Sequence, residues 1–284
     1  MTIMNGVTRM KKKPYLVFMD IDGTLAVSHQ KVSRYTVKTI ETLQKRDDVI
    51  FYIASGRMYE FACLVRNQIN PQVHMITSNG AYYETAAGTV SETLGADALT
   101  QIYDVSHQYN LAVNFFAHDT VYYTKKVPAF VLRNFANIVS GNRKVRSYKA
   151  SDQQLLLNHA AEINNGIMIS PGHGELLKEA RQELASEQLL ELSSSGKDNI
   201  ELIPKGVDKA TAVQAVQESF GTDAAHTLVF GDGMNDTGMM QVADISVAMG
   251  NALPQVKEIA NYETDTNTND GLAKFLRQYF DLSL

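Results

Sequence analysis

The chain is poor in cysteine and has no hydrophobic run long enough to cross a bilayer. Cys63 is the only cysteine in 284 residues, which excludes an intramolecular disulfide and a metal centre built from several thiolates. No apolar stretch approaches the ~20 residues that a spanning helix needs, and residues 1–13 lack the apolar centre of a signal peptide. These absences predict a protein of the reducing cytoplasm that does not bind membranes.

An excess of positive charge is also missing. The 26 lysines and arginines are outnumbered by 31 aspartates and glutamates, so the formal net charge is -5. Without a large positive field, neither nucleic acid nor an anionic lipid surface is expected as a partner. The basic cluster at residues 11–13 is predicted to be a solvated flank of the first strand.

What the chain does contain is typical of a folded globular protein. Hydrophobic residues make up 44% and charged residues 20% of the sequence, which argues against long disordered tracts. Because 284 residues exceed what most single cores use, two domains are expected.

Continuous Val-, Ile- and Phe-rich segments alternate with helical patterns. Strands with this composition are usually buried on both faces, and helices then cover them. Ser33 and Asp208 are predicted to cap helices, and Gly221 is predicted to end the second of these. A helical pattern also covers residues 57–65. The fold class is therefore α/β with a doubly wound parallel sheet, whose strands are predicted at residues 15–20, 49–55, 74–79, 227–232 and 245–250.

The middle of the chain has a different pattern of predicted strands and helices, and it is predicted to be an inserted α+β domain. The domain boundaries are placed at 1–85 and 191–284 for the sheet core and at 86–190 for the insertion. Small residues at 86–88 and 193–196 are the expected hinges. Within the insertion, strands are predicted at 111–116, 121–124 and 167–170, and helices at 128–138 and 175–184.

Polar side chains follow the predicted strands of the core. Ligands bind beyond the carboxyl ends of the strands in open α/β sheets, so these residues should meet in one crevice. Three carboxylates there would repel one another unless a cation joined them, and oxygen ligands favour Mg²⁺, which also accepts a substrate phosphate. The residues concerned are Asp20, Asp22, Ser55, Asn79, Asp232, Asn235 and Asp236.

The pair Asp20 and Asp22 suits phosphoryl transfer. Asp20 can present its side chain to the metal and attack phosphorus, while Asp22 offers its backbone carbonyl to the metal. The side chain of Asp22 is then free to protonate the leaving oxygen and later to take a proton from water. Gly23 allows the sharp turn that follows.

Four motifs in this order resemble those of the haloacid dehalogenase superfamily. They are Asp20-Ile-Asp-Gly-Thr-Leu25, Ser55-Gly56-Arg57, Lys209 after residues 205–208, and Gly231-Asp-Gly-Met-Asn-Asp236. The large insertion and the segment Ser78-Asn79-Gly80-Ala81 resemble the Cof-type (subclass IIB) phosphatases, in which an α/β cap covers the core. The resemblance implies a Mg²⁺-dependent phosphatase with an inserted cap that selects the substrate.

The resemblance also implies a role for each motif residue. Asp20 would be the nucleophile, Asp22 the general acid and base, and Lys209 the cation that stabilises the transferring phosphoryl group. The phosphate would be bound by Ser55, Gly56, Asn79 and Asn235. The metal would be bound by Asp20, Asp22, Asp232, Asn235 and Asp236, although Asp236 could instead orient Lys209 or a metal-bound water.

Several alternatives stay open at the level of sequence. Lys205 and Lys209 could each reach the site, with the family pattern favouring Lys209. Asn79 could contact substrate or only lead into the cap. The substrate could be a sugar phosphate or a phosphorylated cofactor. A phosphomutase acting on a hexose phosphate would use the same chemistry, and a non-catalytic phosphate-binding module could use the same fold.

Overall fold

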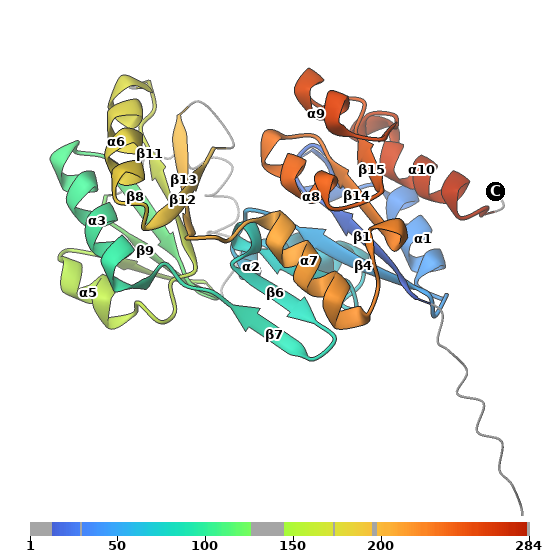
Figure 1. Cartoon of the computed structure of the whole chain (residues 1–284), viewed down its shortest axis with the longest axis horizontal. Helices are drawn as coiled ribbons and strands as arrows, with labels where there is room; N and C mark the ends of the chain where they lie inside the picture. The colour runs from blue at the N-terminus through green and yellow to red at the C-terminus, as the bar shows by residue number, and fades with distance from the viewer. Residues whose placement is uncertain (1–12, 29, 126–144, 173, 195–197, 283–284) are drawn as a thin grey trace, which may run out of the picture.

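The computed structural model describes residues 13–28, 30–125, 145–172, 174–194 and 198–282, which form two lobes joined by two chain crossings (Figure 1). The larger lobe contains both ends of the described chain. The smaller lobe is formed by the middle of the sequence. The predicted helix at 128–138 lies outside the described residues.

The larger lobe is built on an eight-stranded sheet in the order β16-β15-β14-β1-β4-β5-β6-β7. The first six strands pair in parallel, and β6 and β7 add an antiparallel hairpin at one edge. All five predicted core strands are present. The bounds are β1 Tyr15–Met19, β4 Val49–Ala54, β5 His74–Thr77, β6 Tyr82–Thr85, β7 Gly88–Ser91, β14 Thr227–Gly231, β15 Ile245–Ala248 and β16 Tyr262–Glu263.

Two groups of helices cover this sheet. Contacts join α1 to α2 and α10, and separately join α8 to α7 and α9. The central strands are buried almost throughout, as expected when both faces of a sheet are covered. The α/β fold class is therefore confirmed. The bounds are α1 Arg34–Leu43, α2 Tyr59–Ile69, α7 Lys209–Phe220, α8 Thr237–Gln241, α9 Pro254–Ile259 and α10 Gly271–Tyr279.

The predicted helix caps are present in the structure. The Ser33 hydroxyl accepts a hydrogen bond from the N–H of Thr36, and the Asp208 carboxylate accepts one from the N–H of Thr211 at 2.7 Å. Gly221 ends α7 with a left-handed conformation at φ 63°. The Asp208 cap fixes where α7 begins and therefore places Lys209 at its first position.

The smaller lobe, called the cap here, is a six-stranded mixed sheet in the order β10-β9-β8-β11-β13-β12. One face packs on the helices through residues such as Leu99, Val113 and Leu184. The bounds are β8 Ala112–Phe116, β9 Thr120–Tyr123, β10 Arg146–Lys149, β11 Asn165–Ile169, β12 Leu190–Ser193, β13 Asn199–Pro204, α3 Gly95–Gln108, α5 Gln153–Asn158 and α6 Gly174–Ser186.

The other face of the cap sheet is turned toward the larger lobe. Phe116, Ile167 and Ile169 on this face pack against Met58 and Phe61 at the start of α2. This apolar contact holds the cap sheet over the polar ends of the core strands.

Short elements complete the fold: β2 Ala26–Ser28, β3 Lys31–Val32, and the 3₁₀ turns η1 Ser78–Gly80, η2 Ala224–His226, η3 Met234–Asp236 and η4 Asn267–Asn269.

Sheet membership differs from the boundaries predicted at residues 86 and 190. Of residues 86–88, expected to be a hinge, residues 86 and 87 form the turn between β6 and β7 and Gly88 begins β7, all within the core sheet, whereas β12 and β13 belong to the cap sheet. The chain crosses between the sheets after β7 and again after β13. Small residues fit a tight hairpin turn as well as a hinge, so only strand pairing distinguishes the two.

None of the helices in the part of the chain that the structure describes is long and apolar enough to cross a bilayer.

Candidate active site

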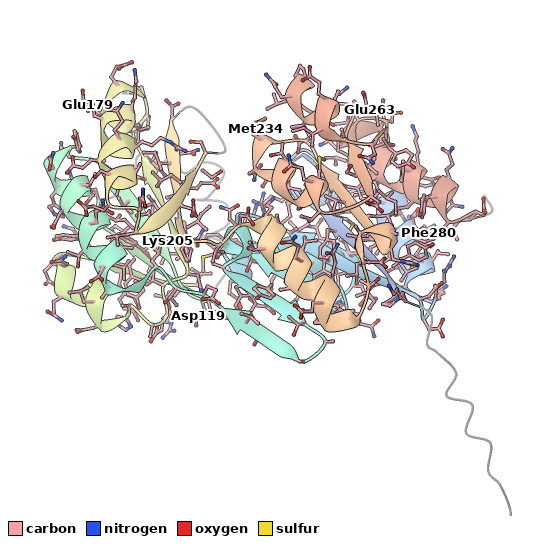
Figure 2. The ribbon with its side chains drawn as sticks, in the orientation of Figure 1. Asp119, Glu179, Lys205, Met234, Glu263 and Phe280 are labelled. Carbon is pink, nitrogen blue, oxygen red and sulfur yellow. The ribbon has the colours of Figure 1, made fainter. Side chains whose placement is uncertain are left out.

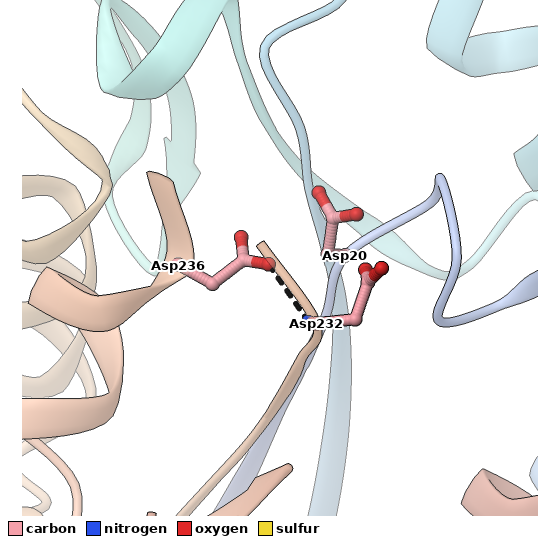
Figure 3. Close-up of side chains that lie close together, drawn as sticks. All are labelled: Asp20, Asp232 and Asp236. Carbon is pink, nitrogen blue, oxygen red and sulfur yellow. Dashed lines mark hydrogen bonds between the residues drawn. The ribbon is translucent and has the colours of Figure 1, made fainter. Parts of the chain in front are cut away.

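Three aspartates meet at the carboxyl ends of the adjacent strands β1 and β14 (Figure 3). Asp20 directly follows β1, Asp232 directly follows β14, and the N–H of Asp20 donates to the carbonyl of Phe230 at 3.1 Å. Asp236 reaches the same point from η3. Ligand oxygens of the three carboxylates all lie within 4.8 Å of one another. Parallel pairing of two strands thus brings residues 212 positions apart into one cluster.

Lys209 contributes a buried positive charge to this cluster. Its ammonium nitrogen Nζ lies 2.7 Å from Oδ1 of Asp20 and 2.7 Å from Oδ1 of Asp236, and the side chain is 2% exposed. Lys205, by contrast, is exposed at the chain crossing (Figure 2). Of the two lysines that the sequence left open, Lys209 is the one at the site.

The Asp236 carboxylate shapes the loop that follows β14. Its Oδ1 accepts from Lys209, and its Oδ2 accepts from the N–H groups of Asp232 and Gly233, both at 3.1 Å. Asp236 is fully buried. Three donors already share its two oxygens, so this carboxylate is arranged to hold Lys209 and the loop in place.

Asp232 has only neutral hydrogen-bond donors in the described structure. Thr24 donates its hydroxyl to Oδ1 at 3.2 Å, and Asn251 donates its side-chain amide to Oδ2 at 3.5 Å. Gly23 lies against this carboxylate with φ +81°, and a Cβ added there would come within 2.1 Å of Oδ2. A glycine is therefore required at this turn both by its backbone conformation and by the closeness of Asp232.

The electrostatics of the cluster favour an additional cation. Burial, followed by the charge of Asp236, raises the pKa of Asp232 to about 6. Burial also raises the pKa of Asp20, with Lys209 acting in the opposite direction. Burial alone would lower the pKa of Lys209, but Asp20 and Asp236 raise it, so the lysine remains charged. Three carboxylates around one ammonium leave surplus negative charge, and a hard divalent cation such as Mg²⁺ fits this donor set.

The raised pKa of Asp232 predicts how pH affects stability without metal. The folded protein keeps the proton on Asp232 up to about pH 6, whereas the ordinary pKa of an aspartate is 3.8. Between these values the unfolded chain binds fewer protons, so the unfolding free energy should fall as pH rises through this window, by at most about 3 kcal/mol for this half-buried carboxyl. Urea unfolding at a series of pH values measures this slope, with Asp232→Asn as the control.

Added Mg²⁺ should reverse this loss of stability. The ion binds ionised carboxylates, so it should stabilise the protein more above pH 7 than near pH 5. An unfolding free energy that is independent of Mg²⁺ at every pH, or a pH slope unchanged in Asp232→Asn, would contradict this description of the cluster.

Asp22 lies beside the cluster and is held by Arg57. The guanidinium donates to both carboxylate oxygens, Nε to Oδ2 at 2.9 Å and Nη2 to Oδ1 at 2.5 Å. The Asp22 side chain is 68% exposed, whereas that of Arg57 is 14% exposed. A planar, two-point contact of this kind fixes the orientation of an otherwise solvated carboxylate.

Ser55 and Asn79 lie at the ends of the neighbouring strands β4 and β5. Ser55 is buried, and its oxygen accepts the N–H of Arg57 at 3.3 Å, so its hydroxyl hydrogen can be donated elsewhere. Asn79 adopts a left-handed conformation with φ 56°, and its Nδ2 donates to the Glu201 carboxylate of β13 at 2.7 Å. Gly56 lies so close that an added Cβ would be 2.8 Å from Asn79 Oδ1.

A cavity of about 380 Å³ extends from this cluster to the cap. On the core side it is lined by Asn79, Lys209 and Asn235, and on the cap side by Glu191, Ser193 and Ile203. All the predicted site residues thus lie at or near the carboxyl ends of the core strands. Asn79 leads into the cap and also lines the cavity.

Sequence reasoning missed several contributors to this site. Arg57 was part of a quoted motif, but nothing in the sequence placed it on Asp22. Thr24 and Asn251 bind Asp232, and Glu201 binds Asn79 from the other lobe. Residue spacing gave no signal for these three, because each contact depends on the folding of distant segments.

Comparisons with known proteins agree with this geometry. The haloacid dehalogenase-like hydrolase family matches residues 17–276. The chain is 31% identical over 286 residues to 5-amino-6-(5-phospho-D-ribitylamino)uracil phosphatase YitU of Bacillus subtilis (strain 168), covering 96% of this chain and 100% of that protein. It is 28% identical over 249 residues to the HMP-PP phosphatase of Serratia proteamaculans (strain 568), covering 86% of each.

Solved structures show the same fold. A haloacid dehalogenase-like hydrolase from Bacteroides thetaiotaomicron superposes with a TM-score of 0.81 at 23% identity, covering 94% of this chain and 100% of that one. A subclass IIB sugar phosphatase superposes with a TM-score of 0.77 at 22% identity, covering 95% of this chain and 100% of that one. The predicted superfamily, the capped α/β fold and the enzyme class are thereby confirmed: the chain belongs to the haloacid dehalogenase-like hydrolase family, and within it to the phosphatases.

Proposed function

We propose that this protein is a Mg²⁺-dependent phosphatase that hydrolyses monoesters of small phosphorylated metabolites through a phosphorylated Asp20. One observation carries this proposal: buried Lys209 lies 2.7 Å from Asp20, beside Asp232, at the ends of two parallel strands. This arrangement supports the proposal, because phosphoryl transfer requires a nucleophile, a cation and metal ligands that are positioned before substrate arrives. A location in the cytoplasm remains part of the same proposal.

The residues that would hold Mg²⁺ are Asp20, Asp232 and the backbone carbonyl of Asp22. Asn235 is the next candidate, and Asp236 would act through Lys209, because its oxygens already accept three hydrogen bonds. When bound, the ion would neutralise charge on the phosphoryl oxygens and keep Asp20 ionised despite its burial.

Each step of the proposed reaction is then carried out by particular side chains. Lys209 and the Ser55 hydroxyl bind phosphoryl oxygens, and an Asp20 oxygen attacks phosphorus. The bond from phosphorus to the ester oxygen breaks as Asp22, in its protonated form and with one oxygen released from Arg57, gives that ester oxygen its proton. A water molecule next attacks the phosphorylated Asp20, passes a proton to Asp22 and releases inorganic phosphate. Asp20 and Asp22 end in the states in which they began.

The substrate is proposed to be a small phosphate ester whose leaving group occupies the cavity under the cap. The similarity to the phosphatase YitU over nearly the whole chain supports a phosphorylated metabolite of this size. We further propose that the cap runs from the residue after β7 to the end of β13, which replaces the boundaries expected from the sequence.

The proposed activity is tested with p-nitrophenyl phosphate. Purified protein should release nitrophenol in the presence of Mg²⁺, and a chelator should stop the release reversibly. Activity that persists after exhaustive chelation would contradict a metal-dependent mechanism. Failure to release nitrophenol, or phosphate from any metabolite ester, would contradict the proposed function itself.

Arg57→Ala is expected to impair the proton transfer assigned to Asp22. The variant removes the two hydrogen bonds that orient the exposed carboxylate. We expect kcat/KM for glycerol 3-phosphate to fall roughly 10-fold to 100-fold, within the range of general acid catalysis. The loss should be smaller for p-nitrophenyl phosphate, because nitrophenolate leaves with little protonation.

Arg57→Lys is the matched control for this experiment. It keeps the positive charge but not the two-point contact, so it should retain only part of the activity. Equal losses for both substrates would contradict a role of Arg57 in positioning the acid, and would indicate a general structural defect.

A further inference from the structure

The cavity beside the residues proposed to bind phosphate has positive charge at one end and negative charge along the rest of its wall. Its core end carries Lys209, but that ammonium already contacts Asp20 and Asp236. The charged residues that line the rest of the cavity in the described structure are Asp208, which caps α7, and Glu191 on β12. A molecule held there by its phosphate would therefore extend toward negative charge.

Strand register explains why Glu191 faces this cavity. In the antiparallel pair of β12 and β13, Glu191 is opposite Ile203 and Ser193 is opposite Glu201. The alternate residue Leu202 is buried against the helices of the cap, and Leu192 packs at the margin of that cluster while also lining the cavity. Side chains alternate along a strand, so Glu191, Ser193, Glu201 and Ile203 share the face turned toward the core.

The buried side chain of Asn79, which lines the same cavity, has an oxygen that accepts no hydrogen bond from the described residues. Asn79 is 3% exposed, and its Nδ2 binds the Glu201 carboxylate, which fixes the orientation of the amide. Its Oδ1 has no hydrogen-bond partner among the described residues. An unpaired buried acceptor is costly unless a ligand or water supplies a donor.

Glu191 is anchored without using its full capacity as an acceptor. One oxygen, Oε1, accepts the N–H of Gly206 at 3.1 Å, which ties the edge strand of the cap to the crossing that leads to Lys209. The structure gives the other oxygen no hydrogen-bond partner among its described residues. The wall thus presents acceptors from Glu191 and Asn79 together with the hydroxyl of Ser193.

We propose that this cavity receives the leaving group, that the leaving group is uncharged and rich in hydroxyl donors, and that Glu191 excludes esters carrying a second anion. This inference rests on the proposed function and deepens it. A hydroxyl can donate to the acceptors of the wall, whereas a carboxylate or second phosphate offers no donor and is repelled by Glu191. Glu191 is therefore a specificity-determining residue that takes no part in the chemistry.

Matched ester pairs test this proposal. Sorbitol 6-phosphate and 6-phosphogluconate differ only in a terminal hydroxymethyl or carboxylate group, and glycerol 3-phosphate and 3-phosphoglycerate differ in the same way. For the wild-type enzyme with Mg²⁺, we expect kcat/KM to be about 10-fold higher for the neutral member of a pair, because water screens the repulsion by the exposed Glu191 side chain. Phosphate release is the measurement.

Glu191→Gln should reduce this preference about 10-fold, and Glu191→Lys should reduce it further. The glutamine keeps the oxygen that accepts from Gly206, so the crossing should be undisturbed. Activity on p-nitrophenyl phosphate should change little in either variant. Glu187→Gln, which removes an exposed charge from the turn before β12, is the matched control and should leave the preference unchanged.

Each outcome decides the question. Equal rates within both pairs, a preference for the acids, or a preference unchanged in both Glu191 variants would overturn the role of Glu191. Turnover of p-nitrophenyl phosphate without turnover of either pair would overturn the hydroxyl-rich leaving group. Absence of turnover on every ester would overturn the proposed function instead, so the two failures are distinguishable.

Discussion

Asp20→Asn should reduce turnover by at least about 10,000-fold, because it replaces the attacking oxygen with an amide while preserving the shape of the side chain. The hydrogen bond that Oδ1 accepts from Lys209 can be kept, so the fold should persist. Removing one of three clustered carboxylates should also relieve repulsion. We therefore expect the metal-free variant to be at least as stable as the wild type at neutral pH.

Phosphate release from p-nitrophenyl phosphate and a metabolite ester, together with urea unfolding, checks both parts of this prediction. Asp97→Asn, which neutralises an exposed aspartate on α3 in the cap, is the control and should retain full activity. Substantial turnover by Asp20→Asn would show that another group attacks phosphorus. A variant that fails to fold would show that Asp20 has a structural role that its contacts do not indicate.

Lys209→Met should have the second-largest effect, on both activity and stability. Methionine has a similar length but leaves Asp20 and Asp236 buried without their shared cation. Losing one partner of a buried ion pair typically costs about 3–5 kcal/mol. Losing a preorganised cation at the transferring group should lower kcat by roughly 100-fold to 1,000-fold.

The pH dependence separates these two effects. Burial raises the pKa of Asp20, so acidic pH should protonate Asp20 and restore part of the lost stability of Lys209→Met but none of its activity. Lys205→Met is the matched control, because Lys205 is exposed four residues earlier and should change neither quantity appreciably. If Lys205→Met proved the more damaging variant, the assignment of the catalytic lysine would be wrong.

The core sheet could be predicted from sequence because its signals are local. Each central strand is a continuous apolar run that ends in a functional residue, and the run 15–19 followed by Asp20 is the clearest case. The caps Ser33 and Asp208 fixed helix starts for the same reason. The fold class implies that these strands are parallel, and the structure shows that β1 pairs with β14, which brings Asp20 and Asp232 together.

The remainder depended on contacts that no local pattern encodes. The turn at residues 86–88 fits a hinge or a hairpin equally well until β7 is seen paired with β6. The boundary predicted at residue 190 leaves nearly all of β12 and β13 in the core, yet their partners lie in the cap sheet. Glu201 and Glu191 face the active site only through that pairing, so the sequence could not identify either.

The pairing of Asp22 with Arg57 has a consequence for the catalytic cycle. An acid that is exposed and flexible would spend little time in the orientation needed for proton transfer. Arg57 restricts that freedom by its contact with the Asp22 carboxylate. In the proposed mechanism, substrate selection would depend on Glu191 in the cap and proton transfer on Asp22 and Arg57, so mutation should alter one without the other.

The central claim is that Asp20 and Asp232 share one divalent cation, and anomalous diffraction from crystals soaked in Mn²⁺ tests it most directly. We predict a single strong peak at the ends of β1 and β14, about 2.1 Å from a carboxylate oxygen of each residue. A peak at another site, or no peak between these residues in crystals of an enzyme that Mn²⁺ activates, would contradict the account.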